Sequence, residues 1–209
     1  ARQADWLNQA WHVTATTPAG ALEYTLHIAG AHNVRNSLAA LACALAAGAP
    51  LSAIAAGLSN FEPVQGRSRA QLVQYAGQTL TLVDDSYNAN PDSVRAAIEV
   101  LAALPAPRLL VLGDMGEVGT QGPHFHTEAF ALALGKNIEN VLVTGDACTQ
   151  AAMNFESIKC HPEMADLQAA VLATLPVVNS VLVKGSRFMK MERVLQAIVE
   201  ASAKGAAPC

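Results

Sequence analysis

TLVDDSYNANPDSVRAAIEVL, residues 81–101, passes from an apolar strand pattern to an amphipathic helix pattern within a few residues. Alternating polarity and β-branched side chains predict a strand over 79–85. Asn90 is a favourable N-cap residue, Pro91 suits the first helical position, and Asp92 complements the helix dipole. The stretch therefore predicts a strand, a polar loop and a helix that begins at Pro91.

The same succession of strand and helix continues to the end of the chain. The expected strands are RLLVLG at 108–113, NVLVTG at 140–145 and SVLVKG at 180–185, with helices near 122–135, 146–154 and 163–175 and a closing helix that carries Met191, Val194, Leu195, Ile198 and Val199. Continuous apolar runs such as VLVTG and VLVKG are typical of strands covered on both faces. Alternation of this kind predicts an α/β fold, a doubly wound, mostly parallel sheet with helices on both faces.

The first third of the chain has a different pattern. Residues 10–29 predict two strands around the turn TTPAG, a helix then opens at His32 or Asn33, and a second helix spans about 52–59. Proline, glycine and charge coincide in FEPVQGRSR, 61–69, as in an interdomain linker. We therefore expect two domains, 1–69 and 70–209.

Composition excludes several classes of protein. The chain has 209 residues, of which 52% are hydrophobic and 14% charged, so it is not globally disordered. Its net charge of −4 and scattered cations argue against nucleic-acid binding. The uncharged stretch 36–61 is interrupted by Gly48-Ala49-Pro50, which favours two buried helices over membrane insertion.

The cysteines and the N-terminus indicate the compartment. Cys43, Cys148, Cys160 and Cys209 form no CxxC pair and have no zinc-ligand spacing, so we expect reduced thiols. The first ten residues, ARQADWLNQA, contain no apolar signal-peptide core. Both observations favour a cytoplasmic protein.

Polar residues follow the strands at four places: 84–90, 113–119, 145–146 and 184–187. In open α/β sheets, ligands bind outside the carboxyl ends of the strands. Lys184 and Arg187 bracket Gly185-Ser186 between a strand and a helix, which suits an anion pocket. The alternative is an ordinary Ser186 N-cap with two surface cations.

Other polar groups admit two interpretations. His32, Asn33 and Asn36 share one helix face and could contact an adenine edge, or an asparagine could simply cap the helix. GDMGEVG at 113–119 is not a dinucleotide fingerprint and is best explained as a structural turn. His124 and His126 lack a third ligand at a suitable spacing, so we expect a surface role at a helix start and no metal site.

Five motifs occur in order along the chain: GAHNVRNSLAA at 30–40, GR at 66–67, DDSYNANPDS at 84–93, GDMGEVG at 113–119, and KGSR followed by ME at 184–192. Together they resemble the Mur ligases over essentially the whole chain. The resemblance implies that residues 1–69 are the tail of an ATP-binding central domain. It also implies that residues 70–209 are a Rossmann-like C-terminal domain.

The resemblance further implies a cytoplasmic, monomeric ligase of peptidoglycan precursor synthesis. Its partners would be UDP-N-acetylmuramoyl-tripeptide and D-alanyl-D-alanine, joined through an acyl phosphate with ATP and Mg²⁺ as cofactors. By similarity, ATP would be bound by His32, Asn33, Asn36, Arg67, Asp85, Tyr87, Asn88 and Asn90, and the substrate by Lys184, Ser186 and Arg187. Asn36 would face the adenine and Asp85 would accept hydrogen bonds from the ribose.

The family's phosphate loop, uridine-nucleotide domain and magnesium ligands have no counterpart in the chain and would precede Ala1. No catalytic residue or metal ligand is therefore assigned, and we expect this chain alone to be inactive. One alternative is a self-contained module that binds a nucleotide or a small acid without catalysis. A dehydrogenase-like domain is disfavoured by the incomplete glycine pattern.

Overall fold

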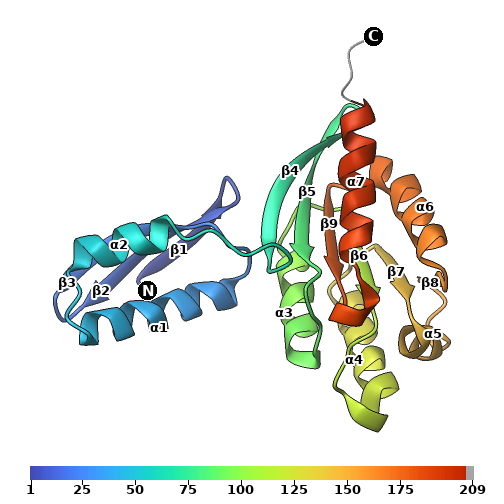
Figure 1. Ribbon diagram of the computed structural model, residues 1–209, viewed down its shortest axis with the longest axis horizontal. Coiled ribbons are helices and arrows are strands. Elements are labelled where there is room, and N and C mark those ends of the chain that lie inside the picture. Colours follow the sequence, from blue (N-terminus) through green and yellow to red (C-terminus); the bar gives the residue numbers. More distant parts are fainter. Residues whose placement is uncertain (206–209) are drawn as a thin grey trace. The chain divides into compact units, whose positions relative to one another are not determined.

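A computed structural model describes residues 1–205, and the chain forms two compact units (Figure 1). The first unit comprises residues 1–64 and 68–70, and the second comprises residues 65–67 and the chain from residue 71 onward. The chain thus passes between units after residues 64, 67 and 70, and the first two of these positions lie in the segment 61–69. Cys209, expected to be a reduced thiol, lies outside the described residues, and Cys43, Cys148 and Cys160 are free cysteines.

The first unit is an antiparallel sheet of three strands with two helices. The elements are β1 (Gln3–Leu7), β2 (Ala10–Thr17), β3 (Gly20–Leu26), α1 (Ala31–Ala46) and α2 (Leu51–Ser59), with strand order β1-β2-β3. Val13 and Leu22 on the sheet pack with Leu41 of α1 and Ile54 of α2, so both helices cover one sheet face. The sequence predicted two of these three strands, whereas β1 is fixed by pairing with β2, where Trp6 lies opposite Trp11.

The second unit contains a six-stranded sheet in the order β4-β5-β9-β6-β7-β8. Its strands are β4 (Arg69–Tyr75), β5 (Gln78–Asp85), β6 (Arg108–Gly113), β7 (Asn140–Thr144), β8 (Ile158–Cys160) and β9 (Ser180–Lys184). Strands β5 to β9 pair in parallel, whereas β4 joins β5 through a two-residue turn, which only antiparallel strands allow. The sequence did not predict β8, because a three-residue strand carries too little pattern.

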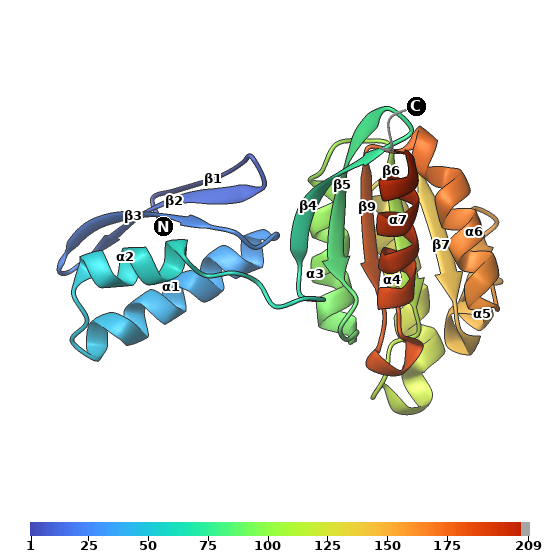
Figure 2. The same cartoon turned by 45° about the horizontal axis from the view of Figure 1, so that its top comes forward.

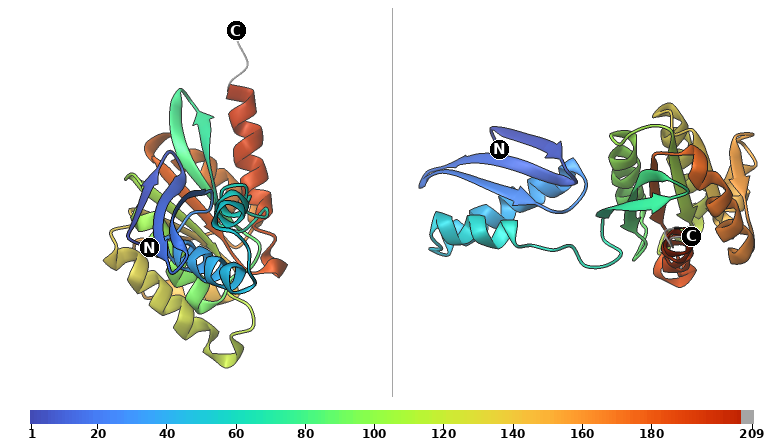
Figure 3. Two further views of the ribbon diagram at one scale, coloured as in Figure 1. Left: turned by 90° about the vertical axis from the view of Figure 1, so that its left-hand side faces the viewer. Right: turned by 90° about the horizontal axis from the view of Figure 1, so that it is seen from above.

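Helices cover both faces of this sheet. They are α3 (Pro91–Ala102), α4 (Gly122–Gly135), α5 (Asp146–Ala152), α6 (Met164–Thr174) and α7 (Glu192–Gly205), with short 3₁₀ segments η1 (Gly119–Gln121), η2 (Leu175–Val177) and η3 (Arg187–Met189). Figure 2 shows α7 in front of the sheet and α3 behind it, and the view from above in Figure 3 shows the sheet between them. The predicted doubly wound α/β fold is confirmed.

The centre of the sheet is fully apolar. Leu82, Leu109, Val111, Val181 and Val183 have no exposed surface. Burying such a side chain stabilises the fold by about 1.5–3 kcal/mol. This explains why the central strands read as continuous apolar runs rather than as alternating ones.

The last strand of the chain, β9, lies between β5 and β6. Because these three strands are parallel, their carboxyl ends meet at one edge of the sheet. The segments that follow Asp85, Gly113 and Lys184 are therefore neighbours, as the sequence predicts. Over residues 1–205, no helix combines the length and apolar character needed to cross a bilayer.

Candidate functional site

Lys184 and Asp85 form an internal ion pair at the ends of β9 and β5. They are direct neighbours in the parallel register, and the Lys184 Nζ donates to Asp85 Oδ2 at 2.6 Å and to the Asn88 carbonyl at 2.9 Å. Only 2% of Lys184 is exposed. Lys184 is therefore not a surface cation, and its ammonium fixes both the Asp85 carboxylate and the loop that follows β5. A contact of Lys184 with substrate stays a prediction.

Ser186 links three loops. Its backbone N–H donates to the Asp114 carbonyl at 2.9 Å, and its hydroxyl donates to the Ala89 carbonyl at 3.2 Å and accepts from the Gly116 N–H. Only 1% of Ser186 is exposed. Ser186 occupies the N-cap position of the 3₁₀ segment that follows, as the capping alternative expects, but its side chain makes no capping hydrogen bond there. The hydroxyl instead joins the loops after β5 and β6.

Two hydrogen bonds join the segment 65–67 to the end of β5 and the loop that follows it. The Gly66 N–H donates to Asp84 Oδ2 at 2.9 Å, and the Tyr87 N–H donates to the Gly66 carbonyl at 3.1 Å. Gly66 has a φ of +81°, and a Cβ there would lie 2.9 Å from the Tyr87 Cβ and 3.0 Å from its backbone nitrogen. Glycine is thus required for the close approach that places Arg67 beside Tyr87.

Tyr87 brings two arginines together. The Arg67 guanidinium carbon lies 4.4 Å from the centroid of the Tyr87 ring, and that of Arg187 lies 5.8 Å from it. Tyr87 is 43% exposed, and Arg187 also pairs with Glu192 at 3.1 Å. Of the three residues predicted to bind substrate, Arg187 alone is exposed, while Lys184 and Ser186 are buried.

Asn90 caps α3, as predicted. Its Oδ1 accepts from the Ser93 N–H at 2.8 Å, while the Ser93 hydroxyl accepts from the Asn90 N–H at 3.0 Å. This reciprocal capping box satisfies two backbone donors at the helix start. Asn88, which is exposed, offers its carbonyl to Lys184. The nucleotide contacts expected of Asn88 and Asn90 stay predictions.

His32, Asn33 and Asn36 lie in the first turns of α1 in the first unit. The Asn33 Nδ2 donates to the Ala29 carbonyl at 2.8 Å, and the Asn36 Nδ2 donates to Asn33 Oδ1 at 3.1 Å. The N-cap is Gly30, without a side-chain cap, so the capping alternative is wrong for these asparagines. Asn36 is exposed at the helix surface, and its predicted contact with adenine stays a prediction.

The GDMGEVG loop anchors α5 and α4. Asp114 Oδ1 accepts from the Cys148 N–H at 2.8 Å, and Oδ2 accepts from the Ala147 N–H at 3.2 Å, so the carboxylate lies at the start of α5. A Cβ on Gly145 would lie 2.3 Å from the Asp114 Cγ, so this close approach also requires glycine. The structural-turn interpretation of the loop agrees with these contacts.

The two histidines of PHFH have different environments. His124 is exposed and pairs with Glu128 at 3.3 Å, as a surface residue at a helix start would. His126 has no exposed surface, so the predicted surface role is wrong for it. The side chain of His126 turns inward from α4, and its Nε2 accepts from the Met115 N–H at 2.9 Å. Its Nδ1 therefore carries the proton and donates to the Gly122 carbonyl at 2.6 Å.

Asp114, His126 and Cys148 each offer one ligand atom, and these atoms lie within 4.8 Å of one another. Two of these groups already accept hydrogen bonds, however: His126 Nε2 accepts from the Met115 N–H, and both Asp114 oxygens accept from the amides of α5. Burial, followed by the neighbouring Asp114 carboxylate, raises the pKa of the Cys148 thiol well above its ordinary value. The group therefore suits a hydrogen-bonded anchor better than a metal site, which needs a thiolate.

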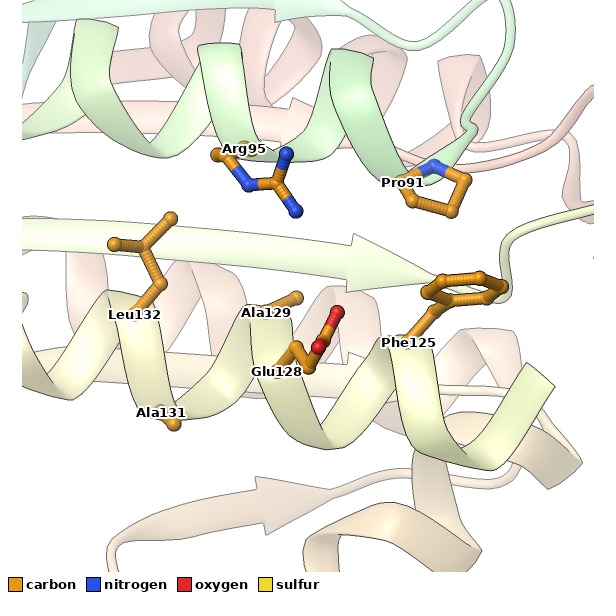
Figure 4. A pocket seen from close by; sticks show the side chains of 7 residues that line it. All are labelled: Pro91, Arg95, Phe125, Glu128, Ala129, Ala131 and Leu132. Atoms are coloured by element: carbon orange, nitrogen blue, oxygen red, sulfur yellow. The ribbon is translucent and has the colours of Figure 1, made fainter. Parts of the chain in front are cut away.

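A groove of about 330 Å³ lies between α3 and α4 (Figure 4). Its lining consists of Pro91, Arg95, Phe125, Glu128, Ala129, Ala131 and Leu132. None of the predicted site residues lines it. Sequence reasoning could not find this groove, because it depends on how two distant helices pack.

The comparisons with known proteins agree with this architecture. Residues 68–202 match the family described as Mur ligase, glutamate ligase domain. The chain is 39% identical over 192 residues to the UDP-N-acetylmuramoyl-tripeptide–D-alanyl-D-alanine ligase of Escherichia coli (strain K12). The aligned residues make up 90% of this chain and 41% of that protein. The ligase of the same name from Haemophilus influenzae (strain ATCC 51907 / DSM 11121 / KW20 / Rd) is 37% identical over 190 residues, 88% of this chain and 41% of that protein.

Solved structures show the same similarity. The crystal structure of MurF from Acinetobacter baumannii has a TM-score of 0.82 at 31% identity and covers 95% of this chain and 44% of that one. MurF from Thermotoga maritima in complex with ADP has a TM-score of 0.81 at 21% identity, covering 98% and 46%, and supports the fold alone. The chain spans about two fifths of the length of the curated relatives that it matches.

The fold and the site define a doubly wound α/β domain with its polar groups at the carboxyl ends of β5, β6 and β9. A domain of this class binds ligands at that edge. The chain belongs to the Mur ligase family.

Proposed function

We propose that this chain forms the C-terminal part of a ligase that joins D-alanyl-D-alanine to UDP-N-acetylmuramoyl-tripeptide. The reaction forms an amide through an acyl phosphate while ATP is cleaved to ADP and phosphate, in the cytoplasmic synthesis of peptidoglycan precursors. The proposal is supported by the relatives of that name, of which the Escherichia coli protein matches 90% of this chain.

The single observation that carries the assignment to the site is the position of Asp85. It ends β5 with its carboxylate held by Lys184, one oxygen at 2.6 Å from the ammonium. A carboxylate oriented in this way accepts hydrogen bonds from ribose hydroxyls without first having to be ordered. In this proposal Asn36 faces the adenine with support from His32 and Asn33, and Arg67 reaches the nucleotide.

Two buried carboxylates near the proposed site already accept hydrogen bonds from the protein. Asp84 accepts from Gly66 and Ser86, and Asp114 accepts from the amides of α5. Neither is an open oxygen ligand of the kind that Mg²⁺ requires, and no Mg²⁺ ligand is assigned to this chain. The reaction steps assigned to this chain involve binding and orientation alone.

A chimera tests the proposal. Residues 1–209 would replace the matched segment of the Escherichia coli relative, and formation of the UDP-linked pentapeptide would be followed together with release of phosphate. We expect ATP-dependent ligation that needs both the tripeptide and D-alanyl-D-alanine. Residues 1–209 alone serve as the control and should release no phosphate from ATP.

Replacement of Asp85 by alanine in the active chimera should raise the Kd for ATP about ten- to a hundredfold, because a charge-assisted hydrogen bond contributes about 1.5–3 kcal/mol. The loss should be smaller for 2′-deoxy-ATP or 3′-deoxy-ATP, each of which already lacks one ribose hydroxyl. A folded chimera that binds ATP but ligates nothing would contradict the proposed activity and favour a binding module. Equal losses for all three nucleotides would remove Asp85 from the ribose site.

A further inference from the structure

We propose that His126 is a positioning residue for the proposed ligation: its buried, neutral ring holds both ends of the loop 115–121, and this loop in turn fixes Ser186 after β9. The position of the loop follows from hydrogen bonds inside this chain. The consequence for the reaction rests on the proposed function and on the predicted contact of Ser186 with substrate.

The ring of His126 spans the loop from one end to the other. Its Nε2 accepts from the Met115 N–H at 2.9 Å, and its Nδ1 donates to the Gly122 carbonyl at 2.6 Å. Met115 opens the loop after β6, and Gly122 is the first residue of α4. His126 has no exposed surface, so both bonds lie where an unmade hydrogen bond is costly. These two bonds form the His126 bridge.

The tautomer of the ring decides whether this bridge exists. Asp114 Oδ1 lies 3.8 Å from the His126 Nε2, so a proton on Nε2 would face that carboxylate. This distance is too long for a hydrogen bond, and both Asp114 oxygens already accept from the amides of α5. A proton on Nε2 would also leave the Met115 N–H without its acceptor. The tautomer with the proton on Nδ1 satisfies both ring nitrogens, and the bridge requires it.

The loop 115–121 needs such an anchor because its own conformation is unfavourable. Glu117 has a φ of +59°, in the left-handed region that residues other than glycine adopt at a cost. Glu117 and Thr120 are exposed, so the outer part of the loop gains little from burial, whereas Met115 is only 3% exposed. The buried end at Met115 therefore holds the rest of the loop in place.

Hydrogen bonds connect this loop to the loops on either side. The Gly116 N–H donates to the Ser186 hydroxyl, which in turn donates to the Ala89 carbonyl at 3.2 Å. A Cβ on Gly116 would lie 3.0 Å from the Ser186 Oγ, so the two residues are in close contact. Because Gly116 directly follows Met115, a shift of Met115 moves the donor that Ser186 depends on.

Asp85 is held by a separate contact. Its carboxylate accepts from the Lys184 ammonium at 2.6 Å, a bond that involves neither Ser186 nor the loop after β6. Loss of the His126 bridge therefore disturbs Ser186, which is predicted to contact substrate, more than Asp85, which is predicted to contact ATP. This difference separates a positioning role from a general loss of stability.

Two substitutions separate the two bonds of the bridge in the 209-residue chain. In His126→Gln the amide oxygen replaces Nε2 as an acceptor, whereas in His126→Asn the amide nitrogen replaces Nδ1 as a donor. We expect ¹⁵N spectra of the parent chain to show the ring proton on Nδ1. Exchange of the Met115 amide hydrogen should be about tenfold faster in His126→Asn than in the parent, and within about threefold of the parent in His126→Gln.

His124→Gln is the matched control, because His124 is exposed on the same helix and pairs with Glu128 instead. It should leave the exchange of the Met115 amide unchanged. A ring proton on Nε2 in the parent chain would overturn the proposal, as would equal exchange of Met115 in His126→Asn and in the parent. The tautomer is measured on the parent chain, so it decides the matter even if a variant fails to fold.

The chimera tests the consequence for the reaction. We expect His126→Asn to raise the KM for a peptide substrate about tenfold while the Kd for ATP changes less than about twofold, and His126→Gln to restore most of the KM. Equal losses for ATP and for the peptide substrates would overturn the positioning role. Failure of the parent chimera to ligate would contradict the proposed function alone, since neither the tautomer nor the amide exchange depends on ligation.

Discussion

At the residue scale, the ion pair between Lys184 and Asp85 has consequences for stability. The Lys184 side chain is 3% exposed and that of Asp85 is 14% exposed, so removing one partner leaves a charge in a largely buried place. Loss of one member of a buried pair typically costs about 3–5 kcal/mol, mostly from the unpaired charge that remains. The pair is therefore sensitive to single substitutions and tolerant of paired ones.

We predict that Lys184→Met lowers the free energy of unfolding of the second unit by about 3–5 kcal/mol. The double variant Lys184→Met/Asp85→Asn should lose less than Lys184→Met alone, because the uncompensated carboxylate is gone. Urea unfolding followed by hydrogen exchange of the β9 amides measures both. A double variant no more stable than Lys184→Met would contradict the ion pair as the source of the effect.

Cys148 gives the second unit a dependence on alkaline pH. Burial and Asp114 raise the pKa of its thiol, so the folded state keeps the proton at a pH where the unfolded chain has lost it. The unfolded state then binds fewer protons, and stability falls as pH rises above about 8.5, the ordinary thiol pKa.

We predict a steeper loss of stability between pH 8 and pH 10 in the parent chain than in Cys148→Ala. The slopes are compared rather than the absolute values, because alanine also removes packing around a fully buried side chain. Urea midpoints measured across this pH range decide the matter. Parallel slopes in the two proteins would show that Cys148 does not titrate between the folded and unfolded states.

At the element scale, α3 depends on its N-terminal residue. The Asn90 side chain satisfies the Ser93 N–H, and replacing such a cap by alanine costs about 0.5–2 kcal/mol. We predict that Asn90→Ala lowers the free energy of unfolding by this amount, as measured by urea unfolding. Asn88→Ala is the matched control, because the structure uses the Asn88 backbone carbonyl and the change keeps it. Equal effects of the two changes would argue against capping.

Features of the fold that depend on neighbouring residues could be predicted from the sequence, whereas those that depend on distant partners could not. The central strands, the Asn90 cap and the start of α3 are encoded by neighbouring residues, and these features could be predicted. The burial of Lys184 could not, because its partner Asp85 is 99 positions away. The surface role predicted for His126 was wrong for the same reason. Its Nε2 accepts a hydrogen bond from the Met115 N–H, and only the packing of α4 brings these two atoms together.

At the scale of the whole molecule, the segment 65–67 belongs to the second unit although it precedes β4. Its contribution comes from the two hydrogen bonds that join Gly66 to Asp84 and Tyr87. Each such bond stabilises a fold by about 0.5–1.5 kcal/mol, with more expected where one partner is charged. The second unit should thus be more stable with this segment than without it.

We predict that residues 65–209 unfold cooperatively on their own, and that residues 68–209, which keep β4 whole but lack the segment 65–67, are less stable by about 1–3 kcal/mol. Circular dichroism during urea unfolding measures both proteins. Both tryptophans of the chain, Trp6 and Trp11, belong to the first unit, so their fluorescence in the 209-residue chain reports that unit separately. A single shared transition for fluorescence and circular dichroism would contradict independent units.

The position of β9 also determines when the protein can fold during its synthesis. This strand is the last to leave the ribosome, yet it fills the middle of the sheet between β5 and β6. Until residues 180–184 emerge, β5 and β6 each present an unpaired edge, and such edges invite aggregation. A nascent chain of this protein therefore exposes these edges until its last strand is made, and a premature stop before Ser180 leaves an open sheet rather than a shortened domain.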